Sequence, residues 1–180
     1  MMKKIVAVLL GTMIGSSLYA GNYDTTSKSF LGIEVGAATI EADTYGILGE
    51  HNHKGKNIAY GLRFGAQNKE WRTMLIGNYL NSSKNDQKYF KGQATFDYLL
   101  RQESALNPFI GLNIGYINYR TSPDNNGNDS FNSFLYGGEA GIIVGATDNI
   151  ELDFGYRYSF CSSSHMNHTE NIVFGMNYMF

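Results

Sequence analysis

Apolar and polar residues alternate along most of the chain beyond residue 27. In 150–160, Ile, Leu, Phe and Tyr occupy the even positions, and Glu, Asp, Gly, Arg and Ser occupy the odd positions. The last ten residues, 171–180, place Ile, Phe, Met, Tyr and Phe at every second position in the same way. Successive side chains of a β-strand point to opposite faces, so a period of two predicts strands with one apolar face.

This alternation recurs in segments of about ten residues each, separated by polar connections. We predict eight strands, within 31–37, 57–67, 71–80, 90–100, 110–116, 134–145, 150–160 and 171–180. A tilted strand of about 9–11 residues is long enough to cross a bilayer. An even number of strands lets both ends of the chain finish on the same side of a membrane.

The connections differ in length in a regular way. Those at 68–70, 101–107 and 147–149 are short, whereas those at 43–56, 81–88, 121–130 and 161–170 are longer and polar. Short turns on the periplasmic side and longer loops on the outer side are typical of transmembrane β-barrels. The pattern therefore predicts which end of the barrel faces outward.

The two faces of the predicted strands differ in chemistry. One face consists of Leu, Ile, Val, Phe, Tyr and Ala. The other carries Gly, Asn, Gln and the charged residues Glu34, Arg63, Lys91, Asp97, Glu139, Asp153 and Arg157. In a membrane barrel the apolar face is turned outward to lipid and the polar face inward. The mean hydropathy of −0.26 agrees with this arrangement, because only every second residue would meet lipid.

Large aromatic residues stand near the ends of the predicted strands. They include Trp71, Tyr79, Phe90, Tyr98, Tyr158 and Phe180. Aromatic side chains collect at the two membrane–water interfaces, where one end of the ring system is apolar and the other is wet. We therefore expect an all-β, transmembrane, antiparallel up-and-down barrel of eight strands.

The first twenty residues have the composition of a secretory signal. Lys3 and Lys4 precede an apolar run from Ile5 to Ile14, Ser16 and Ser17 follow it, and Ala20 stands before a polar segment. This run is shorter than the roughly 20 residues that a transmembrane helix requires. We predict a cleavable signal peptide at 1–20 and a barrel domain at 21–180, with strands within about 27–180. The net charge of −2 would become more negative on cleavage, because two lysines and no acids are removed.

Charges of both signs lie on the predicted inner face. An eight-stranded barrel is just wide enough for its own side chains to fill, and buried charges persist mainly when they are paired. We predict an interior network formed by Glu34, Arg63, Glu139, Asp153 and Arg157. The expectation is a plugged core, and the alternative is a narrow proton or ion path.

The order of signal peptide, eight alternating strands and terminal Phe resembles the OmpA/OmpX-type small outer-membrane barrels. The ending is similar to the sorting signal of that family, with Gly175, Tyr178 and Phe180 at the matching positions. The resemblance implies location in the bacterial outer membrane, contact with outer-membrane lipids and lipopolysaccharide, and a monomeric barrel. It also implies periplasmic chaperones and the barrel-assembly machinery as partners during biogenesis.

Few residues of the sequence suggest a binding site, a disulfide or a metal centre. The negative charge disfavours nucleic acid as a partner, and the single Cys161 excludes an intramolecular disulfide. His51, His53, His165 and His168 fall in predicted loops, next to Glu50 and Cys161. They are the candidates for metal binding, although their spacing matches no fixed zinc signature. We expect neither a metal nor another cofactor.

The sequence favours a structural or surface-contact protein over a conduit for small molecules or ions. An outer-leaflet hydrolase that modifies lipid A is the less favoured alternative. It would draw on Ser159, Ser162, Ser163, Ser164, His165 and Glu170. A nucleophile needs an oriented base within hydrogen-bonding reach, and serines clustered in a loop do not indicate one. We therefore predict that the protein is not an enzyme.

Overall fold

The chain folds into a single closed β-barrel in a computed structural model, which describes residues 27–44, 51–82, 87–100, 106–121, 129–163 and 167–180. The strands are β1 (Lys28–Thr44), β2 (His51–Gln67), β3 (Trp71–Ser82), β4 (Gln87–Leu99), β5 (Leu106–Thr121), β6 (Asp129–Gly145), β7 (Ile150–Cys161) and β8 (His168–Met179). The predicted signal peptide at 1–20 lies outside the described residues.

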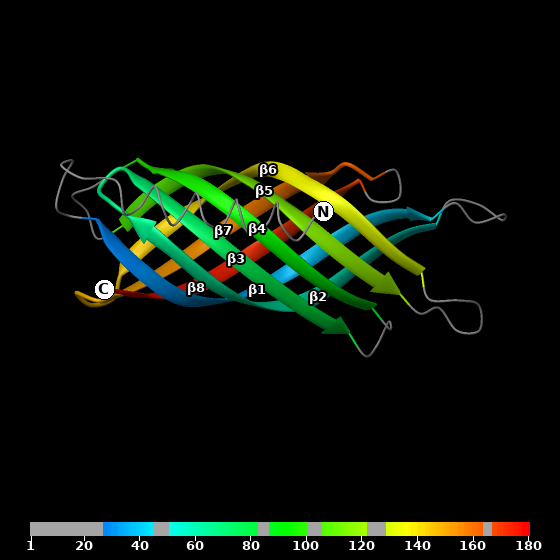
Figure 1. Ribbon diagram of the computed structural model, residues 1–180, viewed down its shortest axis with the longest axis horizontal. Coiled ribbons are helices and arrows are strands. Elements are labelled where there is room, and N and C mark those ends of the chain that lie inside the picture. Colours follow the sequence, from blue (N-terminus) through cyan, green and yellow to red (C-terminus); the bar gives the residue numbers. More distant parts are fainter. Residues whose placement is uncertain (1–26, 45–50, 83–86, 101–105, 122–128, 164–166) are drawn as a thin grey trace, which may run out of the picture.

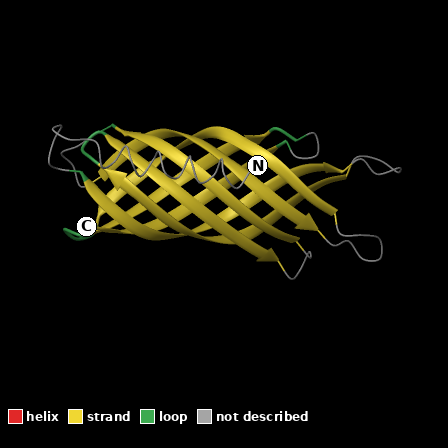
Figure 2. Ribbon diagram, in the orientation of Figure 1, coloured by secondary structure: helices red, strands yellow, loops and turns green. Residues whose placement is uncertain are grey.

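Each strand pairs antiparallel with the next in sequence, and β8 closes the barrel by pairing with β1 (Figures 1 and 2). This confirms the predicted eight-stranded, antiparallel up-and-down barrel. Within the described ranges there is no helical segment with the length and hydrophobicity of a membrane span.

The strands are longer than the ten residues predicted from the alternation. They have between 12 and 17 residues, so they continue into segments predicted as loops. His51 and His53 belong to β2 and His168 to β8, so their assignment to loops was wrong. The alternation of apolar residues ends where the strands leave the apolar layer. Backbone pairing continues beyond that point, as between Thr44 of β1 and His51 of β2.

Two hairpins extend further than the others at the end opposite the short turns. β1 and β2 have 17 residues each, and β5 and β6 have 16 and 17. The pairing of β2 with β3 stops at Tyr60 and Tyr79, so residues 51–59 of β2 have no ladder partner on that side in the described part of the chain. Likewise, β6 pairs with β7 only from Leu135 onward. Both long hairpins therefore rise above their neighbours with one strand edge unpaired.

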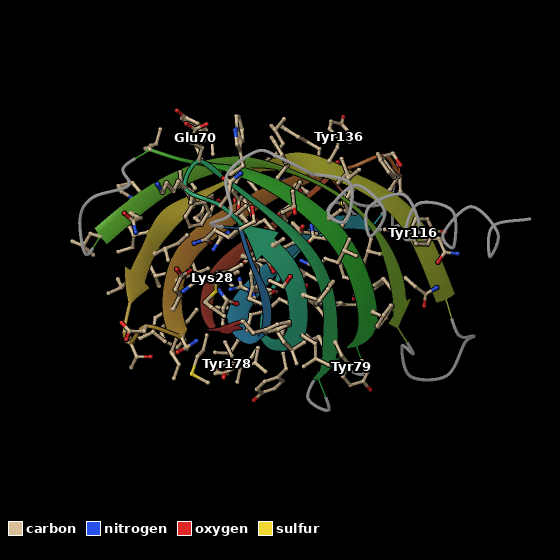
Figure 3. All side chains as sticks on the ribbon, turned by 60° about the vertical axis from the view of Figure 1, so that its left-hand side comes forward. Lys28, Glu70, Tyr79, Tyr116, Tyr136 and Tyr178 are labelled. Carbon is tan, nitrogen blue, oxygen red and sulfur yellow. The ribbon has the colours of Figure 1, made fainter. Side chains whose placement is uncertain are left out.

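The outer face of the barrel is apolar, as the alternation predicted. Leu112 is 69% exposed and Leu62 is 67% exposed. Tyrosines point away from the barrel in Figure 3, where the labels mark Tyr79, Tyr116, Tyr136 and Tyr178. Near the short turns, the Trp71 ring stacks on Phe96 with 4.7 Å between centroids. Near the opposite end, Tyr136 stacks on Phe160 at 5.7 Å. This is the lipid-facing belt with two aromatic rims that a membrane barrel requires.

The interior has three layers, which the sequence analysis did not anticipate. At the end with the long hairpins, an apolar cluster fills the barrel: Ala38, Ala59, Leu80, Tyr89, Ile117, Tyr119 and Leu135. At the end with the short turns, two more clusters do so: Phe30, Met74, Ile76 and Met179 in one, and Leu99, Phe109 and Ile143 in the other. Buried charged residues lie between these apolar caps.

We predict that Leu112→Arg will destabilise the barrel in lipid vesicles by about 2–4 kcal/mol, because it places a charge on the lipid face near the middle of β5. Leu106→Arg is the matched control on the same face of the same strand, at its turn end. It should cost about 0–1 kcal/mol, because the interface is wet there. Urea unfolding in vesicles measures both. Equal costs would show that this face is not turned to lipid.

Candidate functional site

Eight charged side chains are buried in the middle layer of the barrel. The acids are Glu34 (β1), Asp97 (β4), Glu139 (β6) and Asp153 (β7), and the bases are Arg63 (β2), Arg72 (β3), Lys91 (β4) and Arg157 (β7). Each is at most 6% exposed. All of them stand at inward positions of the two-residue alternation, so the strand pattern itself brings them into the barrel.

Arg63 joins two acids that come from different strands. Its Nη2 lies 2.9 Å from Glu34 Oε2, and its Nη1 donates to Asp153 Oδ2 at 2.5 Å. Its Nε also donates to Glu34 Oε2, at 3.1 Å. The planar guanidinium can bind two carboxylates at once, which a lysine ammonium does less well. Arg63 therefore links β1, β2 and β7 through the interior.

Arg72 extends the same network toward the short turns. Its Nε donates to Asp97 Oδ2 at 2.8 Å, and its Nη1 donates to Asp153 Oδ2 at 3.0 Å. The guanidinium also lies over the ring of Phe109, 4.5 Å from the centroid. A cation over an aromatic face is stabilised further when it is desolvated. Arg72 thus connects the charged layer to an apolar cap.

Arg157 extends the network from Glu34 to Glu139. Its Nε donates to Glu139 Oε2, and its Nη1 lies 3.4 Å from Glu34 Oε1. Asn78 Nδ2 donates to that same Glu34 oxygen at 2.6 Å. Glu34 therefore accepts hydrogen bonds on both carboxylate oxygens, from three strands.

Together these contacts form one unbroken chain of alternating charge. It runs through Asp97, Arg72, Asp153, Arg63, Glu34, Arg157 and Glu139. Removing one member of a buried ion pair leaves an uncompensated charge, which costs about 3–5 kcal/mol. The network is therefore suited to keeping the strands in one fixed arrangement around the interior.

The structure brings together all five residues that the sequence placed in the network: Glu34, Arg63, Glu139, Asp153 and Arg157. The sequence did not identify Arg72 and Asp97 as members. For Asp97, its place on the inner face of the alternation was the available signal. The alternation does not tell which residues meet across the interior, because that depends on the stagger between strands.

Gly175 leaves the space that the Arg63 guanidinium occupies. A Cβ at this position would overlap Arg63 Nη1 and would lie 2.6 Å from Asp153 Oδ1. Gly175 thus has a packing role in addition to its place in the predicted assembly signal. The other two residues of that signal, Tyr178 and Phe180, are 57% and 63% exposed on the outer face.

The cavity inside the charged layer is about as large as a single water molecule. A cavity lined by Arg63, Arg72, Phe109, Asp153 and Arg157 has a volume of about 10 Å³, close to the minimum that one water needs. Apolar caps lie above and below it. This layer can hold charges and protons in place, but it has no room for an organic substrate.

The residues considered for metal binding do not converge in the described part of the chain, which contains no group of three potential ligands. His168 Nε2 lies 3.5 Å from Glu170 Oε1, and its ring stacks on Tyr158. His51 and His53 are described only as backbone positions of β2, and His165 lies outside the described residues.

The serines of the hydrolase alternative have separate positions. Ser159 lies inside the barrel and donates to Asn113 Oδ1 at 2.7 Å. Ser162 Oγ accepts from the Phe134 backbone N–H at 3.2 Å, and the Ser163 backbone N–H donates to Ser133 Oγ at 3.2 Å. Ser164 lies outside the described residues. A hydrolase site is therefore not assembled by the contacts described.

Solved structures of bacterial barrels are similar to this chain. Neisserial surface protein A superposes with a TM-score of 0.69 at 17% identity, over 84% of this chain and 97% of that chain. OprH of Pseudomonas aeruginosa gives a TM-score of 0.58 at 20% identity, over 85% and 99%. Ail of Yersinia pestis, in complex with the heparin analogue sucrose octasulfate, gives 0.56 at 14% identity, over 87% and 100%. The chain has the fold of the small outer-membrane β-barrels.

No family model and no curated protein matches the sequence. The fold and the exposed apolar belt together define an integral membrane protein. The bacterial membrane that holds barrels of this kind is the outer membrane, with the short turns on the periplasmic side. The protein is thus a transmembrane barrel of the outer membrane.

We predict that Arg63→Met will lower the free energy of unfolding by about 3–5 kcal/mol, because Glu34 and Asp153 lose their shared cation. Lys69→Met, in the exposed turn between β2 and β3, is the control and should change it by no more than about 0.5 kcal/mol. Urea titration in vesicles, followed by fluorescence of the single Trp, measures both. Equal losses would contradict a role for the network in stability.

Proposed function

We propose that the protein is a structural and surface-contact barrel of the outer membrane, without an open channel. The observation that supports this is the contrast between the interior of the barrel and its two long hairpins. The interior is filled by the charge network and its apolar caps, whereas the β1–β2 and β5–β6 hairpins have the longest strands and would extend beyond the bilayer. Contact with outside molecules is therefore assigned to the hairpins and not to the lumen.

The length of the hairpins supports this assignment. Strands of 16 or 17 residues exceed the roughly 9–11 that cross a bilayer. About six extra residues at ~3.3 Å each, on a tilted strand, reach on the order of 15 Å above the membrane. Residues 51–59 of β2 also lack pairing on the β3 side. Such an edge offers backbone N–H and C=O groups to an extended segment of another protein.

The charge of the outer segments bears on the class of partner. Residues 41–56, 81–88, 118–132 and 161–170 contain five Lys or Arg residues and seven Asp or Glu residues. This net negative charge does not favour a polyanion such as the heparin analogue bound by Ail. We infer a protein partner, on a host or on a neighbouring cell. The outer-membrane lipids and lipopolysaccharide would surround the barrel itself, and the assembly machinery and periplasmic chaperones would act only in biogenesis.

The closed lumen predicts no stable conductance in planar bilayers. The refolded barrel should give a current indistinguishable from that of the bilayer alone, because apolar caps close both ends of the charged layer. Insertion is checked by heat-modifiable migration of the same sample on gels. Steady single-channel steps from the inserted protein would overturn this proposal in favour of a conduit.

Shortening the β1–β2 hairpin should weaken contact severalfold without unfolding the barrel. Replacing 43–52 with Asn-Gly joins Ala42 to His53, which already face each other in the ladder, through a turn suited to hairpins. We expect bacteria that display this variant to adhere severalfold less to surfaces coated with extracellular-matrix proteins.

The matched control replaces 83–86, in the β3–β4 connection, with Asn-Gly and should leave adhesion unchanged, because that hairpin does not extend beyond its neighbours. Heparin-coated surfaces should retain none of the strains. Equal adhesion by the wild type and the β1–β2 variant would reject the proposal that this hairpin makes the contact.

A further inference from the structure

Two acids of the charged layer meet across a glycine. Asp97 on β4 and Glu139 on β6 are both opposite Gly111 on the intervening strand β5. The two side chains share the inner face of the barrel, so their carboxyl groups converge over Gly111. A Cβ at position 111 would overlap Asp97 Oδ1, so glycine at this position permits the approach.

Each carboxyl group uses only one of its oxygens to bind an arginine. Asp97 Oδ2 accepts from Arg72 Nε at 2.8 Å, and Glu139 Oε2 accepts from Arg157 Nε. The other two oxygens, Asp97 Oδ1 and Glu139 Oε1, are buried and have no donor among the described groups. Asp97 is fully buried and Glu139 is 6% exposed, so bulk water does not supply the missing donor.

Two ionised carboxylates have only acceptors, so they cannot hydrogen-bond to each other. A single proton between Oδ1 and Oε1 would satisfy both oxygens and remove the repulsion of two like charges in a desolvated site.

We propose that Asp97 and Glu139 form a proton-binding site that holds one shared proton at neutral pH. The charged groups that face it are Arg72 from β3, Arg157 from β7 and Lys91 from β4. Asp153 from β7 and Glu34 from β1 lie behind the arginines, in contact with Arg72 and Arg157 respectively. The two arginines favour a proton over a metal cation as the ligand, because a larger positive charge would be repelled. The site is independent of the outer hairpins and goes beyond the proposed contact function.

Infrared spectroscopy of the barrel in lipid vesicles tests this proposal directly. At neutral pH the wild type should show the carbonyl stretch of a protonated carboxylic acid. Asp97→Asn and Glu139→Gln should each lose it, because an amide N–H takes the place of the proton and the remaining carboxyl group can ionise. Lys91→Met and Asp153→Asn are controls inside the same layer and should keep the band.

Stability provides a second readout that separates a shared proton from a merely buried acid. Asp97→Asn mimics the protonated acid, so the unfolding equilibrium constant should change by less than about threefold. Asp153→Asn removes a carboxylate that binds two arginines and should raise that constant about a hundredfold or more. Absence of the band in the wild type, or its retention in Asp97→Asn or Glu139→Gln, would overturn the proposal, as would equal destabilisation by Asp97→Asn and Asp153→Asn.

Discussion

The pairing of charges inside a narrow, water-poor barrel is the constraint on which the rest of the structure depends. Lipid surrounds the outside, so the polar side chains of an alternating strand must point inward. Eight strands leave an interior that is only as wide as the side chains themselves. Arg63 shows the consequence, since it contacts Glu34 and Asp153 directly and not through a layer of solvent. Each inward charge must find its partner on another strand, and the network ties the strands together.

The apolar caps and the charge network depend on each other. The cluster around Leu80 and Ile117 closes one end, and Phe30 and Phe109 help to close the other. By excluding water, the caps strengthen the ion pairs between them, but they also raise the cost of any unpaired charge. The network in turn fixes the cross-section against which the caps pack, as Arg72 does by lying over Phe109.

The sequence was sufficient for the parts of the fold that alternation controls, and insufficient for those that depend on stagger. It predicted eight strands and placed Glu34, Arg63 and Asp153 inside, because a period of two assigns faces without knowledge of the partners. It ended the strands too early and left His51 in a loop, because apolar residues mark the lipid layer and not the end of backbone pairing. It also missed the Arg72–Asp97 pair, which arises only once the register of β3 and β4 is known.

A filled interior also determines where evolution can place function on this fold. Changing an inward residue such as Asp153 disturbs contacts with Arg63, Arg72 and Asn177 at once, so the lumen tolerates little variation. The outer parts of β2 and β6 are less constrained, because β3 does not pair with β2 there and β7 does not pair with β6. Segments with few constraining contacts can change sequence and length without unfolding the barrel. Recognition of outside molecules is therefore expected to reside in the hairpins, while the network serves the barrel that displays them.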